Sequence, residues 1–131
     1  MTKKELSQLY YLNKEICQEK ERLAELRAAA IDTSVKISGL PHAGKLSNKT
    51  AIATQIADCE AIIDAKIQLS IVEYNRLNRY IAGIDDSLMR QILSLRYING
   101  LSWNAVATHI GGDNTADAVR KAHNRFLSRG L

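Results

Sequence analysis

The chain has 131 residues, a length typical of one domain or of one small domain with an extension. Apolar residues make up 46% of it and charged residues 24%, with seven glycines and one proline, a composition that excludes collagen-like, low-complexity and disordered chains. No uncharged apolar run approaches the roughly 18 residues of a membrane span, and the charged first residues lack the apolar segment of a signal peptide. We therefore expect a cytoplasmic protein that has no membrane segment.

Residue types that carry chemistry are few and scattered. Cys17 and Cys59 lie far apart in the sequence, and neither they nor the three histidines show metal-ligand spacing. No side chains follow the pattern of a nucleophile and its base. The sequence therefore predicts free thiols, no bound metal, no cofactor and no enzymatic activity.

The first long helical pattern covers residues 2–33. Neither proline nor glycine occurs in it, and most of its polar residues are good helix formers. One set of apolar side chains recurs every seven residues, at Leu9, Ile16, Leu23 and Ala30. Leu12 and Leu26 occupy a second heptad position, which Glu19 interrupts. This spacing predicts an amphipathic helix with coiled-coil character.

Residues 35–47 contain the only proline and two glycines, which predicts a loop. A second helix is expected over residues 48–82, with Ser47 or Asn48 as its N-cap and Gly83 after its end. Its apolar stripe has a period near 3.5 over about four heptads and consists of Ile52, Ile56, Cys59, Ile63, Ile67, Ser70, Tyr74, Leu77, Ile81 and Ile84. Four further apolar positions widen the stripe, namely Ile62, Leu69, Val72 and Tyr80.

Two apolar-striped helices joined by a short loop are expected to fold back on each other as a long antiparallel, coiled-coil-like hairpin. The expected pairing leaves Cys17 and Cys59 offset along the axis by about 7–8 Å, too far for a disulfide. The hairpin would form a first domain over residues 1–84, which supports the rest of the chain and joins copies of it. Because the second helix is apolar beyond one stripe, we expect a homodimer.

Residues 85–131 predict a second domain of three helices. The sequence Asp85-Asp86-Ser87 is suited to cap a short helix, which Asn99-Gly100 would end in a left-handed C-cap. Its expected core face consists of Leu88, Ile92 and Leu95. Ser102 is expected to cap the next helix, and the spacing of Leu101 and Val106 fits a hydrophobic staple.

The last helix is expected from about Thr115 to Ser128, after the turn at residues 111–114. Its expected inward face consists of Val119, Ala122 and Phe126. The final 30 residues carry the largest basic excess of the chain, with Arg120, Lys121, Arg125 and Arg129 against Asp113 and Asp117. A basic terminal helix indicates a polyanionic partner.

This order of short helix, helix, turn and basic helix is typical of a helix-turn-helix module. Residues 96–111 (RYINGLSWNAVATHIG), followed by Thr115, Val119 and Arg120, resemble the region 4 DNA-binding domain of bacterial sigma factors. Nearly the whole chain, including residues 37–41 (ISGLP) and 87–92 (SLMRQI), is similar to a family of small proteins from phages and prophages of Gram-positive bacteria, akin to the ArpU- and RinA-type late-transcription regulators. The turn between Gly111 and Thr115 is two residues longer than in the sigma pattern, which changes the expected docking angle.

With Val119 toward the core, helical geometry turns Asp117, Lys121 and Asn124 outward, flanked by two arginines. Asn pairs with adenine, Lys with guanine and Asp with cytosine N4, whereas arginines suit phosphates. The resemblance maps the base-reading positions onto Ala116, Asp117 and Lys121, and Ala116 replaces a longer polar residue there. The predicted DNA-binding residues are Thr115, Ala116, Asp117, Arg120, Lys121, Asn124 and Arg125.

The sequence thus predicts a transcription regulator of the phage and prophage type that binds double-stranded DNA sequence-specifically, with RNA polymerase as a further candidate partner. Two alternatives stay open. One is a DNA-packaging subunit similar to a small terminase, for which we would expect a ring of about eight or more chains. The other is a coiled-coil interaction protein that does not bind DNA, for which affinity for duplexes should show no salt dependence.

Overall fold

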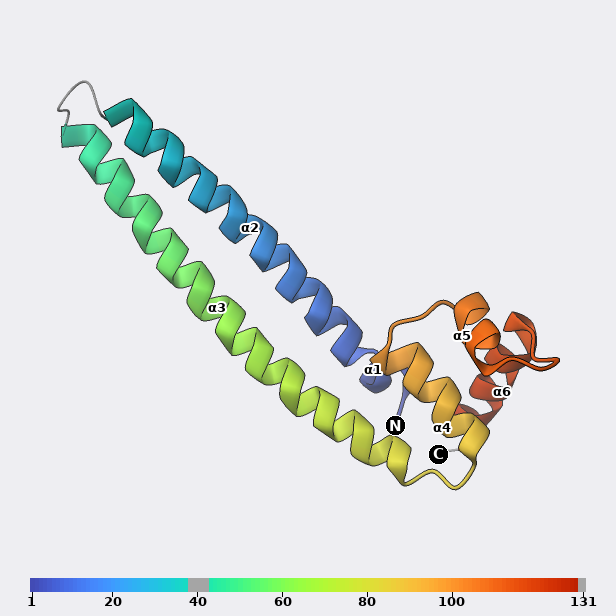
Figure 1. Cartoon of the computed structure of the whole chain (residues 1–131). Coiled ribbons are helices and arrows are strands. Elements are labelled where there is room, and N and C mark those ends of the chain that lie inside the picture. Colours follow the sequence, from blue (N-terminus) through green and yellow to red (C-terminus); the bar gives the residue numbers. More distant parts are fainter. Residues whose placement is uncertain (38–42, 130–131) are drawn as a thin grey trace. The chain divides into compact units, whose positions relative to one another are not determined.

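The computed structural model describes residues 1–37 and 43–129, and within these ranges the chain is helical and contains no strand (Figure 1). The predicted all-α class is thereby confirmed for the described residues. The elements in chain order are α1 (Lys3–Leu6), α2 (Gln8–Ile37), α3 (Ala43–Ala82), α4 (Ser87–Leu93), the π-helical turn η1 (Ser94–Ile98), α5 (Trp103–Ile110) and α6 (Ala116–Arg129).

The chain divides into two compact units. The first consists of Met1–Leu12 and Ser70–Leu131, and the second of Asn13–Leu69. This division differs from the predicted one between residues 84 and 85. The reason is that the start of the first predicted helix and the end of the second share one buried cluster with the C-terminal helices. The residues that they contribute are Leu6, Leu9, Leu77 and Ile81.

The ends of the predicted long helices also differ from expectation. The predicted helix over 2–33 is interrupted at Ser7, whose hydroxyl donates to the carbonyl of Lys3 at 2.8 Å. α2 continues to Ile37 and α3 begins at Ala43, so Ser47 and Asn48 lie inside α3 and are not N-caps. Residues 43–47 include Ala, Lys and Leu, whose helix propensity outweighs the weaker signals of Gly and Ser. The rest of the predicted loop, residues 38–42, lies outside the described residues.

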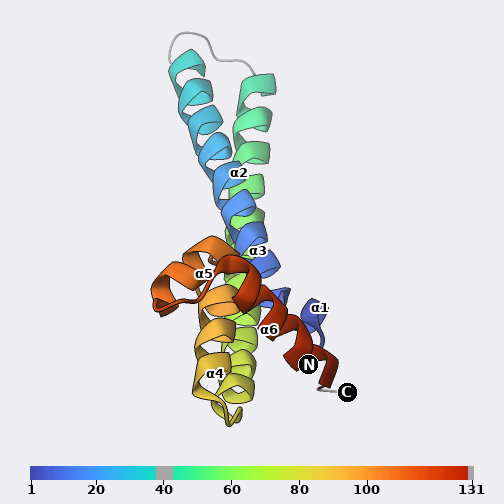
Figure 2. The ribbon, with the colours of Figure 1, turned by 90° about the vertical axis from the view of Figure 1, so that its right-hand side faces the viewer.

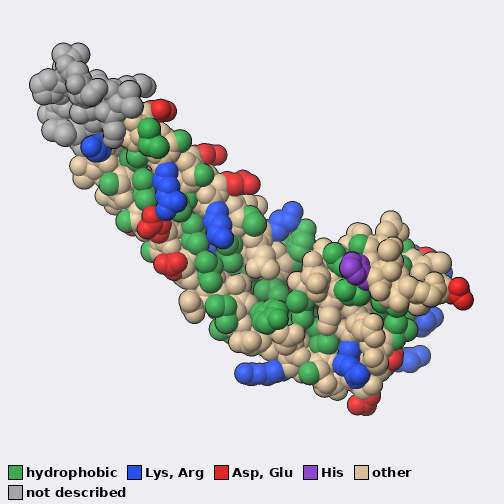
Figure 3. All heavy atoms as spheres, viewed as in Figure 1, with side chains coloured by type: hydrophobic (Ala, Val, Ile, Leu, Met, Phe, Trp, Pro, Cys, Tyr) green, Lys and Arg blue, Asp and Glu red, His purple; other side chains and the backbone are tan. Residues whose placement is uncertain are grey.

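In the second unit, the segments of α2 and α3 pack against each other in opposite directions (Figure 1, Figure 2). Glu15 pairs with Lys66 at 2.5 Å, and Arg27 pairs with Glu60 at 3.2 Å. Between the helices, a small buried cluster consists of Leu23, Cys59 and Ile63, flanked by Leu26, Ile56 and Ile67. Acidic and basic side chains are interspersed along the surface of these helices (Figure 3).

Glu19, which interrupts the heptad pattern, is nevertheless buried. Its carboxylate accepts from Arg22 at 3.1 Å, and its backbone carbonyl accepts from the Cys59 thiol at 3.4 Å. Burial, and then the neighbouring Glu19 carboxylate, raise the pKa of the Cys59 thiol. Both cysteines are free, Cys17 exposed and Cys59 buried, so Cys59 is the less reactive thiol.

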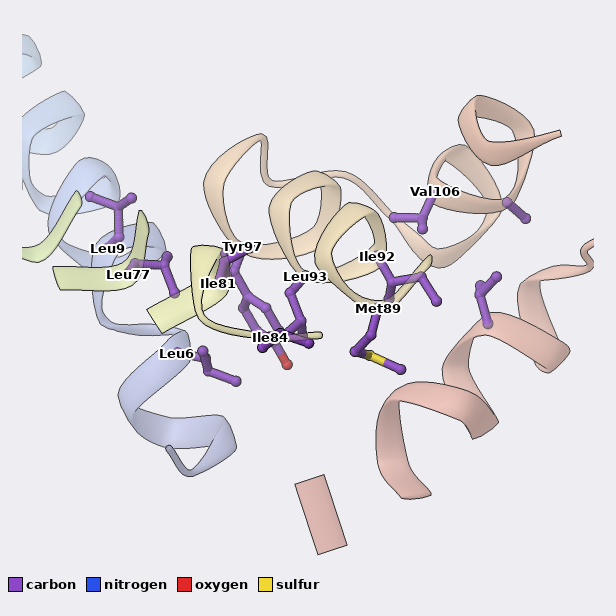
Figure 4. Close-up of a cluster of buried hydrophobic side chains, with 12 residues drawn as sticks. Leu6, Leu9, Leu77, Ile81, Ile84, Met89, Ile92, Leu93, Tyr97 and Val106 are labelled. Atoms are coloured by element: carbon purple, nitrogen blue, oxygen red, sulfur yellow. The ribbon is translucent and has the colours of Figure 1, made fainter. Parts of the chain in front are cut away.

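In the first unit, one buried cluster joins the N-terminal residues, the end of α3 and the C-terminal helices (Figure 4). Its residues are Leu6, Leu9, Leu77, Ile81, Ile84, Met89, Ile92, Leu93, Tyr97, Val106, Ala107 and Val119. No buried polar side-chain atom in the described residues lacks a hydrogen-bond partner. The C-terminal helices are therefore supported by a core to which the start of the chain contributes.

α4 begins where the sequence predicts, because the Asp86 carboxylate accepts from the backbone N–H of Leu88 at 3.1 Å. Its predicted core face is correct at Ile92 but wrong at Leu88, which is 38% exposed. The helix is rotated so that Met89, Ile92 and Leu93 are buried. A seven-residue helix has few turns over which a pattern defines its phase, and the stripe chosen from the sequence started one residue early.

Replacing Ile92 by Ala will therefore destabilise the protein by about 2–4 kcal/mol, since Ile92 is fully buried in the core of the first unit. The Leu88→Ala variant is the matched control on the same helix and should cost less than about 1 kcal/mol. Urea unfolding followed by circular dichroism measures both changes. Equal losses in the two variants would contradict the observed phase of α4.

Candidate functional site

The π-helical turn η1 sets up the site. Its widened bond runs from the backbone N–H of Asn99 to the carbonyl of Ser94, at 3.0 Å, and after it the N–H of Leu101 donates to the carbonyl of Leu95 at 3.1 Å. A π-turn inserts one extra residue into a helical turn and so shifts the phase of the residues after it. Tyr97 lies in this turn and is buried in the core.

The start of α5 follows the predicted capping chemistry. Gly100 takes a positive φ of 69°, which ends the preceding helix at low steric cost. The Ser102 hydroxyl then accepts from the backbone N–H of Ala105 at 3.2 Å, which confirms the predicted N-cap. Val106 belongs to the core cluster of the first unit, and Leu101 is half-buried against it. These contacts fix the direction in which α5 leaves the turn.

The turn between α5 and α6 depends on two glycines. Gly111 and Gly112 have φ values of 76° and 65°, a region that other residues seldom adopt. The Asn114 amide donates to the carbonyl of Gly111 at 3.0 Å and closes the turn. Thr115 then caps α6, because its hydroxyl accepts from the backbone N–H of Ala118 at 3.1 Å. The predicted last helix thus begins one residue later, at Ala116.

The inner face of α6 is held by apolar and polar contacts together. Val119 is buried, and Ala122 and Phe126 are half-buried against the same cluster, in agreement with the predicted inward face. His123 lies on this face as well and is fully buried. It lies one helical turn after Val119, and this spacing is the sequence signal that places it inside.

His123 is the centre of a buried polar network. Its Nδ1 lies 2.9 Å from Oδ1 of Asn124, which only accepts, so Nδ1 carries the proton and Nε2 accepts from the Tyr97 hydroxyl. The indole of Trp103 packs edge-on against the imidazole with ring centroids 4.8 Å apart. Burial lowers the pKa of His123, and the positive charges of Lys3 and Arg96 lower it further. The neutral ring therefore links η1, α5 and α6.

The predicted DNA-binding residues lie together on α6 and at its N-cap. All of them are exposed except Ala116, which is half-buried, and the exposed ones are Thr115, Asp117, Arg120, Lys121, Asn124 and Arg125. The opposite face of the same helix is buried against the core. The structure thus gives α6 an inner face of Val119 and His123 and a polar, exposed outer face.

Ion pairs tie part of this outer face together. The Asp117 carboxylate pairs with Arg120 at 2.6 Å and with Lys121 at 2.9 Å. The hydrogen bonds from Lys121, and then those from Arg120, lower the pKa of Asp117. All three side chains are at least half exposed, and exposed pairs of this kind are weak. Among the described residues Arg125 makes no ion pair, so its charge faces water uncompensated.

Comparison of the chain with protein-family models, curated proteins and solved structures gives no match. Within the described residues no cluster of His, Cys, Asp and Glu has the makings of a metal site. None of the described helices combines the length and apolar character that crossing a membrane requires. The side chains of α5, α6 and their surroundings are therefore the features that indicate a function.

The buried state of His123 makes stability depend on pH. Its pKa in the folded protein lies below the ordinary value of 6.5, so the unfolded chain takes up the proton first as the pH falls. Stability is fully present above about pH 6.5 and is lost progressively below it. Urea unfolding at pH values from 7.5 to 5.5 should show this decrease in the free energy of unfolding. Carboxylates titrate mostly at lower pH, so they contribute little in this range.

Two histidine variants test the assignment. His109 is exposed at the end of α5, so His109→Gln should keep the pH profile of the wild type. His123→Gln removes the titrating ring and should flatten the profile between pH 7.5 and 5.5. A profile that flattens in His109→Gln and not in His123→Gln would contradict the role of the buried imidazole.

Proposed function

We propose that the chain binds double-stranded DNA through α6, as a transcription regulator of the phage and prophage type. In this proposal α4 with η1, α5 and α6 form a helix-turn-helix module in which α6 enters the major groove. The resemblance to region 4 of bacterial sigma factors supports the same assignment. α5 would cross the DNA backbone, as the first helix of such modules does.

One observation carries the proposal, namely the division of α6 into a buried and an exposed face. A recognition helix must present polar side chains to base edges while its other face is held by the protein. Val119 and His123 hold the inner face, and Asp117, Lys121 and Asn124 project on the outer one. The exposed outer face also has more cationic than anionic side chains, as binding to phosphates requires.

The outer face contains groups for both kinds of DNA contact. Arg120 and Arg125 flank the helix and suit phosphates, whereas Lys121 suits guanine acceptors. Asn124 is oriented by His123, because Oδ1 accepts from the imidazole. Its Nδ2 donor and the second lone pair of Oδ1 remain for the N7 and N6–H groups of adenine. The imidazole thus fixes the amide plane before DNA binds.

Salt dependence of DNA affinity tests the proposal. Three or four phosphate contacts predict a log–log slope of about −3 to −4 for a duplex selected from a randomised library. The double variant Arg120→Ala/Lys121→Ala should bind more weakly and reduce the steepness of the slope by at least about one, since Arg120 is the phosphate contact of the two. Fluorescence anisotropy with the labelled duplex measures both quantities.

A charge-matched control uses two lysines away from α6. Lys4→Ala/Lys20→Ala removes the same two charges from exposed positions on α1 and α2 and should leave the slope nearly unchanged. A slope near zero for the wild type would overturn the proposal and favour an interaction protein without DNA contact. Equal losses in the two double variants would mean that net charge, and not α6, determines binding.

We further propose that two copies bind together, joined through α3. A lone module of this kind buries only about 600–1,000 Å² on DNA, which limits its affinity as a monomer. α3 exposes Ile62, Leu69 and Val72, of which Leu69 is 55% and Val72 61% exposed. Their spacings of seven and three residues are those of a coiled-coil seam. A second copy of the same helix is the partner that this spacing fits.

Light scattering after size exclusion measures the mass of the assembly. The wild type should have twice the chain mass, and Leu69→Glu should have the mass of one chain, since a carboxylate on the seam must be desolvated. Gln68→Glu adds the same charge at the neighbouring exposed position and should leave the dimer intact. A monomeric wild type would overturn the dimer, and a ring of about eight or more chains would favour DNA packaging.

A further inference from the structure

A cavity of about 480 Å³ opens at the surface of the first unit, and no residue of α6 lines it. Side chains from α1 and the start of α2 line one side of it, and η1 and the start of α5 line the other. The proposed DNA contacts on α6 use none of its lining residues. Its volume lies within the range of about 300–1,000 Å³ that is usual for small-molecule sites.

The charge of the cavity is entirely positive. Lys3 and Arg96 line it, and no carboxylate does. Neither cation makes a salt bridge within the described residues. Arg96 is half-buried, so its unpaired charge has a higher electrostatic cost than that of an exposed arginine. An anionic ligand would remove this cost.

The protein holds the Arg96 guanidinium in place without neutralising it. One nitrogen donates to the carbonyl of Leu101 at 2.9 Å, and the carbon of the guanidinium lies 4.4 Å from the centre of the Trp103 ring. A guanidinium has five N–H donors, so most of them remain for a ligand. The positive charges of Lys3 and Arg96 also lower the pKa of His123. A fixed fork of donors beside a second cation is suited to a phosphate group.

The remaining lining suits a flat, partly apolar group. Tyr10 and Tyr11 contribute aromatic rings at 5.4 Å between centroids, arranged edge to face. Tyr11 is 59% exposed, so its ring is accessible to a ligand. Gly100 lines the same cavity without a side chain, and a Cβ there would lie 3.7 Å from the Tyr10 ring. Aromatic rings beside cationic donors are the combination that binds a base together with its phosphate.

We propose that this cavity binds a nucleoside phosphate, with the phosphate on Lys3 and Arg96 and the base against Tyr10 and Tyr11. Ser102 adds a further donor, since its oxygen accepts from Ala105 and its O–H remains for the phosphate. This site goes beyond the proposed DNA contact and does not depend on it, because its residues lie outside α6.

Isothermal titration of the full chain with AMP, ADP, adenosine and inorganic phosphate tests the proposal. AMP or ADP should bind saturably with one site per chain, at least about tenfold more tightly than adenosine or inorganic phosphate, because only the nucleotides engage both halves of the cavity. No saturable binding of either nucleotide would overturn the proposal. Equal affinity for ADP and inorganic phosphate would also overturn it, since the tyrosines would then have no role.

Variants locate the binding in the cavity. Lys3→Gln should weaken ADP binding about five- to tenfold, whereas Lys4→Gln, which removes the same charge outside the lining, should change it less than about twofold. Tyr11→Ala should weaken the binding of ADP and leave the affinity for inorganic phosphate unchanged. Because Tyr11 is exposed, the variant should still fold. Equal effects of Lys3→Gln and Lys4→Gln would contradict the site.

A DNA duplex provides the last arm of the test. If the cavity takes nucleotides, ADP should bind as well to Arg120→Ala/Lys121→Ala as to the wild type, which separates this proposal from the one on α6. If instead Lys3→Gln weakens duplex binding and no free nucleotide binds, the cavity is a DNA phosphate contact and the nucleotide proposal is overturned.

Discussion

The hydrogen bond between Tyr97 and His123 is the contact on which the C-terminal part of the first unit depends. It joins η1 to α6 inside an otherwise apolar cluster, where an unpaired hydroxyl or imidazole would be costly. His123 also bonds to Asn124 and contacts Trp103, so one side chain links η1, α5 and α6. Because the network has a partner for each polar atom, it fixes the rotation of α6 about its axis more specifically than apolar packing alone.

Helical periodicity explains how this bond forms. In an uninterrupted α-helix, the phase that buries Ile92 and Leu93 continues at positions 96 and 97, with Arg96 directed partly inward. η1 keeps this arrangement, since Tyr97 is buried and Arg96 lies half-buried against Trp103 and the carbonyl of Leu101. Two neighbouring residues of one turn thus provide the buried hydroxyl for His123 and the guanidinium of the cavity.

Local chemistry made much of this part of the chain predictable from the sequence. The capping residues Asp86 and Ser102 and the positive φ of Gly100 are decided by neighbouring residues, and the sequence contains them all. The exposed positions of α6 followed from helical geometry once Val119 was assigned to the core. The sequence could not show whether these positions contact DNA, and that assignment stays a prediction.

The features that the sequence did not predict depend on contacts between distant segments. The break at Ser7 and the burial of Leu6 and Leu9 with α4 require knowledge of the three-dimensional core, and the heptad pattern hides them. The phase of α4 is decided by its tertiary partners over only seven residues, which is why Leu88 was assigned wrongly. The cavity brings Lys3 next to Arg96 across most of the chain, and no local motif marks it.

Asp117 is an acidic residue among the basic residues of α6, and its presence is compatible with the proposed binding of DNA. Its carboxylate pairs with Arg120 and Lys121 on the outer face in the absence of any ligand. Both pairs are exposed, so exchanging a carboxylate for a phosphate oxygen changes the energy of each cation little. Breaking the two ion pairs therefore costs little free energy. The Asp117 carboxylate that is then left without its partners repels phosphates and can accept a hydrogen bond from a base donor. In the proposed DNA complex, a helix of this composition would give up part of its non-specific affinity, and its contacts would depend more on base identity than on charge alone.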